Sequence, residues 1–220
     1  WKVKRRIVES IFAIGMSPFL MNLAACFIVI IINQGLKKYG GDLAIGAFGI
    51  VNRLVFIVVM IVMGLNQGMQ PIAGYNFGAK LYGRVNKVLR LTIIYATAVT
   101  TFGFLVGMLV PDLVVGIFTS DAELTELSVT GLRITVMFFP IIGFQMVTSN
   151  FFQSIGMAGK AIFLSLTRQM LILLPCLLVL PQFFGVAGVW YSMPVSDLLA
   201  SLIALVMLVC QFRKFRTSPL

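Results

Sequence analysis

Amide and hydroxyl side chains recur within apolar stretches of this sequence, and they have the clearest potential for chemistry. Gln145, Ser149 and Gln153 are spaced at i, i+4 and i+8, with Asn150 beside them. On a helix this spacing places the three side chains on one face. The pattern predicts the wall of a water-filled cavity in which amides bind a solute. The alternative is that these side chains hydrogen-bond neighbouring helices.

A second stripe combines aromatic, thioether and amide groups at helical spacing. It comprises Phe56, Met60, Met63, Gln67 and Gln70. Thioether and aromatic surfaces adapt to hydrophobic cations of varied shape. We expect the stripe to bind such molecules, with ordinary packing or lipid contact as the alternative. Pro71 follows directly and is expected to end the regular helix.

Two opposite charges lie deep within apolar runs. Arg53 is ten residues into one run, and Asp197 is eleven residues into another that starts on the same side. At about 1.5 Å per helical residue, both lie roughly 15 Å deep. A lone charge at that depth costs at least ~2.5–3.5 kcal/mol. We therefore predict an ion pair between Arg53 and Asp197, the alternative being that each faces water separately.

Catalytic and metal-binding patterns find no support in the sequence. The chain has no histidine, and its three cysteines fall inside apolar runs without metal-ligand spacing. The segment Gly74-x-x-x-Gly78-x-Lys80 departs from a phosphate-binding loop, since Ala79 separates the glycine from the lysine and the hydroxyl residue is missing. We predict that the protein is not an enzyme and has no cofactor and no metal site.

The elements that position these residues must be membrane-spanning helices. The 220 residues are 60% hydrophobic and only 11% charged, whereas soluble domains carry about 25% charged residues. Backbone polar groups in lipid must be satisfied within each segment, which favours helices. Six apolar segments are predicted to span the bilayer, at about 7–33, 43–73, 86–110, 127–155, 161–181 and 186–211.

The connections between these spans differ in charge. If the spans alternate in direction, one side receives 12 cations: Lys2, Lys4, Arg5, Arg6, Lys80, Arg84, Lys87, Arg90, Lys160, Arg213, Lys214 and Arg216. The other side receives only Lys37 and Lys38. The positive-inside rule then places both ends of the segment in the cytoplasm. The net charge of +10 is therefore explained by membrane orientation, and no nucleic-acid partner is expected.

Two connections have further features. The outer link at 111–126 carries apolar residues at helical spacing, which predicts a short helix on the membrane surface. The cytoplasmic link places Lys80, Arg84 and Lys87 on one helical face, toward anionic lipid headgroups.

Several motifs in register resemble a known transporter family. They are "GLNQGMQPIAGYNFGAK" with the basic "LYGRVNKVLR" after it, "KYGGDLAIGAFGIVNRL" at 38–54, and "FFQSIGMAGKAIFLSLTRQMLILLP" at 151–175. These stretches look like the C-terminal half of multidrug and toxic compound extrusion (MATE) transporters. The resemblance implies an all-α, polytopic membrane protein, with this chain as one six-helix lobe of a twelve-helix transporter. The N-terminal six-helix lobe of the same protein and the lipid bilayer would be its partners.

The same resemblance implies a function and one departure from the family. Members export small cationic or amphiphilic substrates in exchange for Na⁺ or H⁺. Some branches carry acidic ion ligands in stretches that match 17–27 and 143–154 here, yet neither stretch contains an acid, and Gln145 stands near one such position. The coupling-ion site is therefore expected outside this lobe.

We thus expect residues 1–216 to form a single transmembrane lobe in the plasma (inner) membrane, with 217–220 as the end of a cytoplasmic tail. The function expected is multidrug efflux by antiport. The alternative is a lipid-linked oligosaccharide flippase of the same superfamily, whose cavity would need cations for a pyrophosphate. Apart from Lys87 and Arg90 at the cytoplasmic end of the third span, the only cations within the predicted spans are Arg53, Arg133 and Arg168, which disfavours that alternative.

Overall fold

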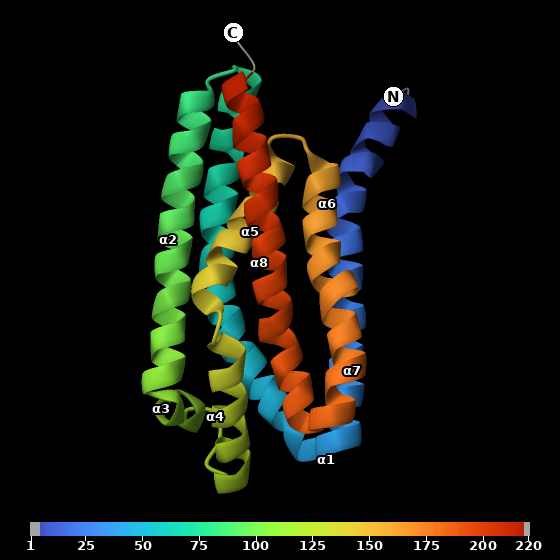
Figure 1. The fold of residues 1–220 in the computed structure, drawn as a ribbon, viewed down its shortest axis with the longest axis vertical. Coiled ribbons are helices and arrows are strands. Elements are labelled where there is room, and N and C mark those ends of the chain that lie inside the picture. Colours follow the sequence, from blue (N-terminus) through green and yellow to red (C-terminus); the bar gives the residue numbers. More distant parts are fainter. Residues whose placement is uncertain (1–4, 218–220) are drawn as a thin grey trace.

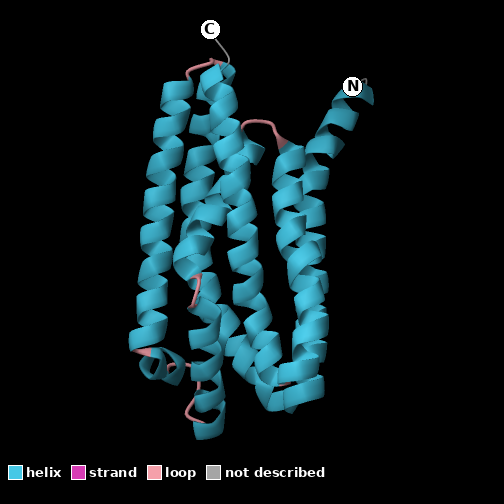
Figure 2. Ribbon diagram, in the orientation of Figure 1, coloured by secondary structure: helices cyan, strands magenta, loops and turns pink. Residues whose placement is uncertain are grey.

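The computed structural model describes residues 5–217, and this part of the chain is a bundle of helices without a strand (Figure 2). The long helices run up and down the same axis, and the described chain begins and ends at the same end of the bundle (Figure 1). The expected all-α membrane fold is confirmed. The predicted tail end at 217–220 lies outside the described residues, apart from Thr217.

The first element, α1 (Arg5–Gly78), consists of two helices joined at Gly41. Gly41 has φ 67° and ψ −162°, a conformation that side chains disfavour and that reverses the chain direction. Its two halves correspond to the predicted spans 7–33 and 43–73. The second half continues to Gly78, so the expectation that Pro71 ends the helix is wrong. Proline costs one backbone bond but is tolerated in membrane helices, where neighbours satisfy the freed carbonyl.

The third span is α2 (Tyr82–Leu109), which follows a tight connection containing Lys80 at φ 58°. After it comes α3 (Pro111–Gly116), a short helix that crosses the end of the bundle (Figure 1). Leu113 is 69% exposed and Ile117 is 75% exposed, whereas Val115 is buried. The predicted short helix in this link is therefore present, although it covers only the first part of 111–126.

The fourth predicted span, 127–155, is broken into α4 (Ala122–Val136) and α5 (Phe139–Ser154). The axis of α5 is bent by 55° away from that of α4. Pro140 in the first turn of α5 explains the break, since it cannot donate a backbone bond to the preceding turn. At the outer end, Asp121 caps α4 by accepting a hydrogen bond from the Leu124 amide at 3.0 Å.

The fifth span comprises α6 (Ala158–Leu166), the π-helical η1 (Thr167–Leu173) and α7 (Leu174–Phe184). The wider η1 lies just before Pro175, where a regular helix would bring the ring against a carbonyl one turn back. The helix passes Pro181, so the fifth span ends three residues beyond its predicted end at 181.

The last span, α8 (Val186–Thr217), begins after Gly185, which has φ 58°. Gly188 near its start lies directly against the Leu180 carbonyl of α7, where a Cβ would clash. With α1 counted as two helices and α4–α5 as one bent span, the described residues form six spans, the number expected for the lobe. Buried side chains form one cluster around Leu36 and Trp190 and another around Phe151 and Phe152.

Candidate functional site

An amide-lined pocket opens between the second half of α1 and α5. Its volume is about 560 Å³, and its described lining is Met63, Asn66, Gln67, Gln70 and Asn150. The first four residues fall at i, i+3, i+4 and i+7, so the helix itself places them on one face. The Gln70 amide nitrogen approaches the Asn150 side-chain oxygen at 3.4 Å, which links the two helices across the pocket.

The amide of Asn66 has no partner in this pocket. The residue is only 2% exposed, and neither its nitrogen nor its oxygen makes a hydrogen bond within the described part of the chain. Asn150 is better satisfied, since its nitrogen donates to the Met146 carbonyl at 3.0 Å. Buried amides are normally paired, so Asn66 is the feature of this pocket that needs an explanation.

The structure separates the members of the predicted stripe on α5. Gln145 and Ser149 are buried, Gln153 is half-buried, and Asn150 alone of these four lines the amide pocket. The Ser149 hydroxyl lies 3.1 Å from the Ser165 hydroxyl and 3.5 Å from the Ala161 carbonyl, both on α6. For Ser149 the geometry favours the alternative role of joining neighbouring helices.

The stripe on the second half of α1 lies on the surface of the lobe. Phe56, Met60 and Met63 are 54%, 58% and 47% exposed, and Gln67 is exposed as well. Met63, Gln67 and Gln70 belong to the amide pocket, whereas Phe56 lines a different cavity. The stripe is therefore exposed from Phe56 to Gln67 and half-buried at Gln70, and its two ends line separate cavities.

Asp197 forms its ion pair with a different arginine from the one expected. Its carboxylate oxygen lies 2.7 Å from Nε of Arg168 in η1, with the Asp197 side chain 7% exposed and that of Arg168 32% exposed. The expected partner, Arg53, is exposed and makes no ion pair among the described residues. Counting residues along the spans predicts how deep Arg53 lies in the membrane, but it does not predict which side of the helix carries its side chain. The neighbouring Asn52 lines the cavity beside Asp197 instead.

Arg168 and Asp197 contribute to a second cavity, of about 270 Å³. Its wall is otherwise mostly apolar and includes Phe48, Phe56 and Met193. The backbone of η1 is also tied to α8, because the Ser196 hydroxyl donates to the Arg168 carbonyl at 2.8 Å. A π-helix shifts the backbone bonding register, so such a carbonyl is available to a neighbouring helix.

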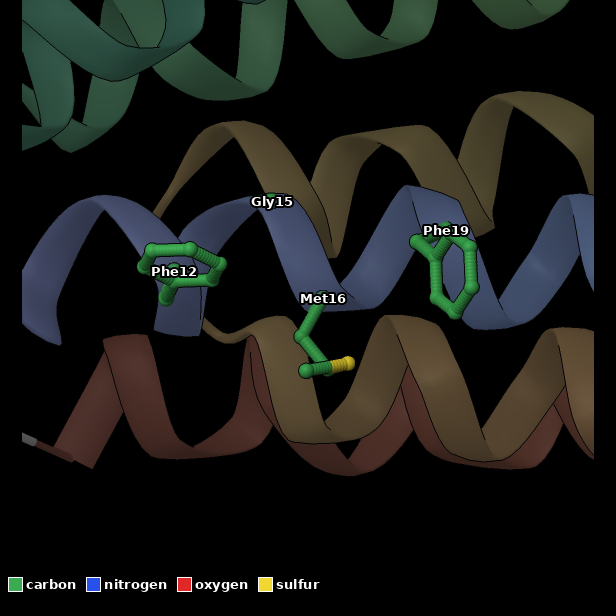
Figure 3. Close-up of a pocket in the computed structure, with 4 residues that line it drawn as sticks. All are labelled: Phe12, Gly15, Met16 and Phe19. Atoms are coloured by element: carbon green, nitrogen blue, oxygen red, sulfur yellow. The ribbon is translucent and has the colours of Figure 1, made fainter.

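A third hollow, of about 430 Å³, lies along the first half of α1 (Figure 3). Figure 3 shows Phe12, Gly15, Met16 and Phe19 following one another along this helix. Phe12 and Phe19 are 67% and 60% exposed. This aromatic and thioether surface resembles the exposed stripe of the second half of α1, but its described lining contains no amide.

Sequence reasoning missed Asn66, Asn52 and Arg168 as members of these sites. Asn66 precedes Gln70 by four residues, and this spacing was a visible signal that it belongs to the same face. No comparable signal pointed to Arg168, because its direction depends on the π-helical turn.

Comparisons with known proteins agree with this architecture. The sequence profile of the MatE family matches residues 14–178. The multidrug export protein MepA of Staphylococcus aureus (strain MSSA476) is 28% identical over 204 residues, which cover 93% of this chain and 45% of MepA. MepA of Staphylococcus saprophyticus is 25% identical over 201 residues, covering 91% of this chain and 44% of that protein.

A solved structure also matches nearly all of this chain with about half of its own length. The MATE multidrug transporter DinF-BH, determined in complex with R6G, matches with a TM-score of 0.86 at 34% identity, covering 99% of this chain and 50% of DinF-BH. The chain thus spans about half the length of the relatives it matches. Because the family profile covers well over half of the sequence and the helices match throughout, this chain belongs to the MatE family of multidrug efflux transporters.

Proposed function

We propose that this chain is the C-terminal lobe of a secondary active antiporter that exports cationic or amphiphilic compounds. The observation that carries the proposal is the amide pocket, an uncharged polar hollow beside exposed methionines in a membrane bundle. Such a surface can bind amphiphiles of varied shape, since thioethers adapt to apolar groups and amides donate and accept hydrogen bonds.

Transport would proceed by alternating access. An N-terminal lobe of six helices would face the exposed stripe of α1, and the two lobes would rock about a cavity near the midplane. Exchange with Na⁺ or H⁺ would bias the side that is open. We place the coupling-ion site outside this lobe, because 17–27 and 143–154 lack acids and the Asp197 carboxylate is paired with Arg168.

The arginines support efflux over lipid-linked sugar transport. Arg168 is paired with Asp197, and no charged residue is among the described residues lining the amide pocket. A pyrophosphate would need several free cations in its cavity.

Transport by the full-length protein in vesicles tests the proposal. We expect an amphiphilic cationic dye to move against its gradient when a Na⁺ or a proton gradient is imposed, and to stop when an ionophore dissipates that gradient. Movement of a lipid-linked oligosaccharide, without dye movement under either gradient, would overturn the proposal in favour of a flippase.

Variants connect the function to the pocket. Gln70→Leu should change the relative export rates of several dyes, because it removes an amide from the pocket at similar size. Gln182→Leu is the matched control, since Gln182 is exposed on α7 and bonds only the Leu178 carbonyl of its own helix among the described residues. Equal dye profiles for wild type and Gln70→Leu would remove the pocket from the transport pathway.

A further inference from the structure

Arg168 and Asp197 both have hydrogen-bonding atoms that their ion pair does not use. The pair joins one nitrogen, Nε, to one carboxylate oxygen, Oδ1. A guanidinium carries five N–H donors, and four of them belong to its two Nη groups. Within the described part of the chain, neither these Nη groups nor the Oδ2 oxygen of Asp197 makes a hydrogen bond.

These unused atoms are accessible, unlike the polar atoms of the neighbouring residues. Thr167 Oγ1 and Gln169 Oε1, on either side of Arg168, each have less than 1 Å² of accessible surface and no partner among the described residues. The Nη groups and Oδ2 are not sealed in this way, and the Arg168 side chain is 32% exposed. The cavity that both residues line reaches the surface of the lobe, because the exposed Asn52 and Phe56 are also part of its lining. A solute can therefore reach both members of the ion pair.

The charge balance of this cavity determines what it can bind. The charges of Arg168 and Asp197 cancel, and the described lining contains no other charged residue. A bound cation or a bound anion would leave one uncompensated charge among mostly apolar walls, which is costly. A molecule that carries both charges avoids this cost. Its carboxylate accepts hydrogen bonds from the Nη groups, and its ammonium donates to Oδ2.

We infer that the cavity binds a short zwitterion with an apolar body, such as the head group of an α-amino acid with an aromatic side chain. The two charges of the ligand must lie a few bonds apart, because the guanidinium and the carboxylate that bind them are 2.7 Å from each other. The volume of about 270 Å³ is just below the roughly 300–1,000 Å³ of sites for drug-sized ligands. It holds the head group, and the aromatic ring packs on Phe48, Phe56 and Met193. The inference rests on the proposed transport function and adds a substrate class to it, at a cavity separate from the amide pocket.

Binding by the full-length wild-type protein gives the first test. Three probes share one apolar body: an α-amino acid with a naphthalene fluorophore as its side chain, its methyl ester and its N-acetyl derivative. At about pH 6 they are a zwitterion, a cation and an anion. Fluorescence polarization in detergent measures each dissociation constant. We expect the zwitterion to bind about tenfold more tightly than either derivative, since each derivative loses one charged hydrogen bond. Equal affinities of the three probes would overturn the inference.

Two variants locate the preference at the ion pair. Arg168→Lys keeps a cation beside Asp197 but removes the Nη groups, so the zwitterion should bind no more tightly than the methyl ester. Asp197→Asn leaves the Arg168 charge uncompensated, so the N-acetyl anion should become the tightest ligand of the three. Arg133→Lys is the matched control, because Arg133 is exposed on α4 and is not among the described residues lining the cavity. If both ion-pair variants fold and keep the wild-type order of affinities, the assignment to this cavity is wrong.

The outcomes separate this inference from the proposed function. Absence of gradient-driven export of an amphiphilic cationic dye in vesicles would refute the antiporter, whatever the binding data show. Export of that dye together with equal affinities for the three probes would refute zwitterion binding and leave the antiporter standing. If neither ion-pair variant folds, the comparison of the three probes on the wild type decides.

Discussion

In the ion pair between Arg168 and Asp197, the Asp197 side chain is the more buried of the two. Two neighbouring side chains contact this residue. The Arg168 guanidinium compensates its charge at 2.7 Å, and the Ser201 hydroxyl bonds its backbone carbonyl at 2.6 Å. Arg168 is a third exposed toward the neighbouring cavity, so the two charges are buried unequally. This asymmetry means that losing one partner should not cost the same as losing the other.

Removing the arginine should destabilise the lobe more than removing the carboxylate charge. Arg168→Leu leaves a buried carboxylate unpaired and should cost about 3 kcal/mol. Asp197→Asn leaves an arginine that can turn toward its cavity, and should cost about 1.5 kcal/mol. Thermal unfolding in detergent measures both, with the exposed Asp112→Asn as a neutral control. Equal stability of Arg168→Leu and wild type would contradict a stabilising pair.

At the scale of helices, the sequence predicted the existence and order of the spans because hydrophobic length is a direct requirement of the bilayer. It did not predict the break between α4 and α5 or the π-helical η1, since both depend on how Pro140 and Pro175 are accommodated by neighbouring helices. For the site residues, too, only part could be predicted. Residue spacing predicted that Met63, Gln67 and Gln70 share one face of α1, whereas the ion-pair partner of Asp197 could not be predicted, because it depends on the direction of one side chain around a helix.

The close approach of α2 and α5 depends on one glycine. A Cβ at Gly143 would lie 2.7 Å from the Thr100 hydroxyl and 2.8 Å from the Ala96 carbonyl oxygen, which belongs to the backbone and cannot turn aside. Gly143→Ala should therefore separate the helices and destabilise the lobe by about 1–3 kcal/mol. Gly49→Ala is the control, because nothing lies within 4 Å of a Cβ there. A thermal midpoint of Gly143→Ala equal to that of Gly49→Ala would contradict this packing argument.

At the scale of the whole molecule, the positions of the connections between helices show at which end of the bundle the cations lie. The α1–α2 and α5–α6 connections lie at the end of the bundle where the described chain begins and ends, and α3 lies at the opposite end (Figure 1). Lys80, Arg84 and Lys160 therefore belong to one end. Lys160 is held there by a hydrogen bond to Gln211 of α8 and lies 5.2 Å from the centre of the Phe152 ring.

The cationic end should face the cytoplasm, as positive residues resist translocation across the inner membrane. Cysteine accessibility in intact cells tests this orientation for the full-length protein after Cys26, Cys176 and Cys210 are replaced by alanine. Arg84 and Asp121 are both exposed, and they lie at opposite ends of the bundle. A membrane-impermeant maleimide should label Asp121→Cys in intact cells and Arg84→Cys only after permeabilisation, which shows that both sites are reactive. The reverse pattern would invert the orientation and place the amide pocket, nearer the Arg84 end along α1, toward the outside.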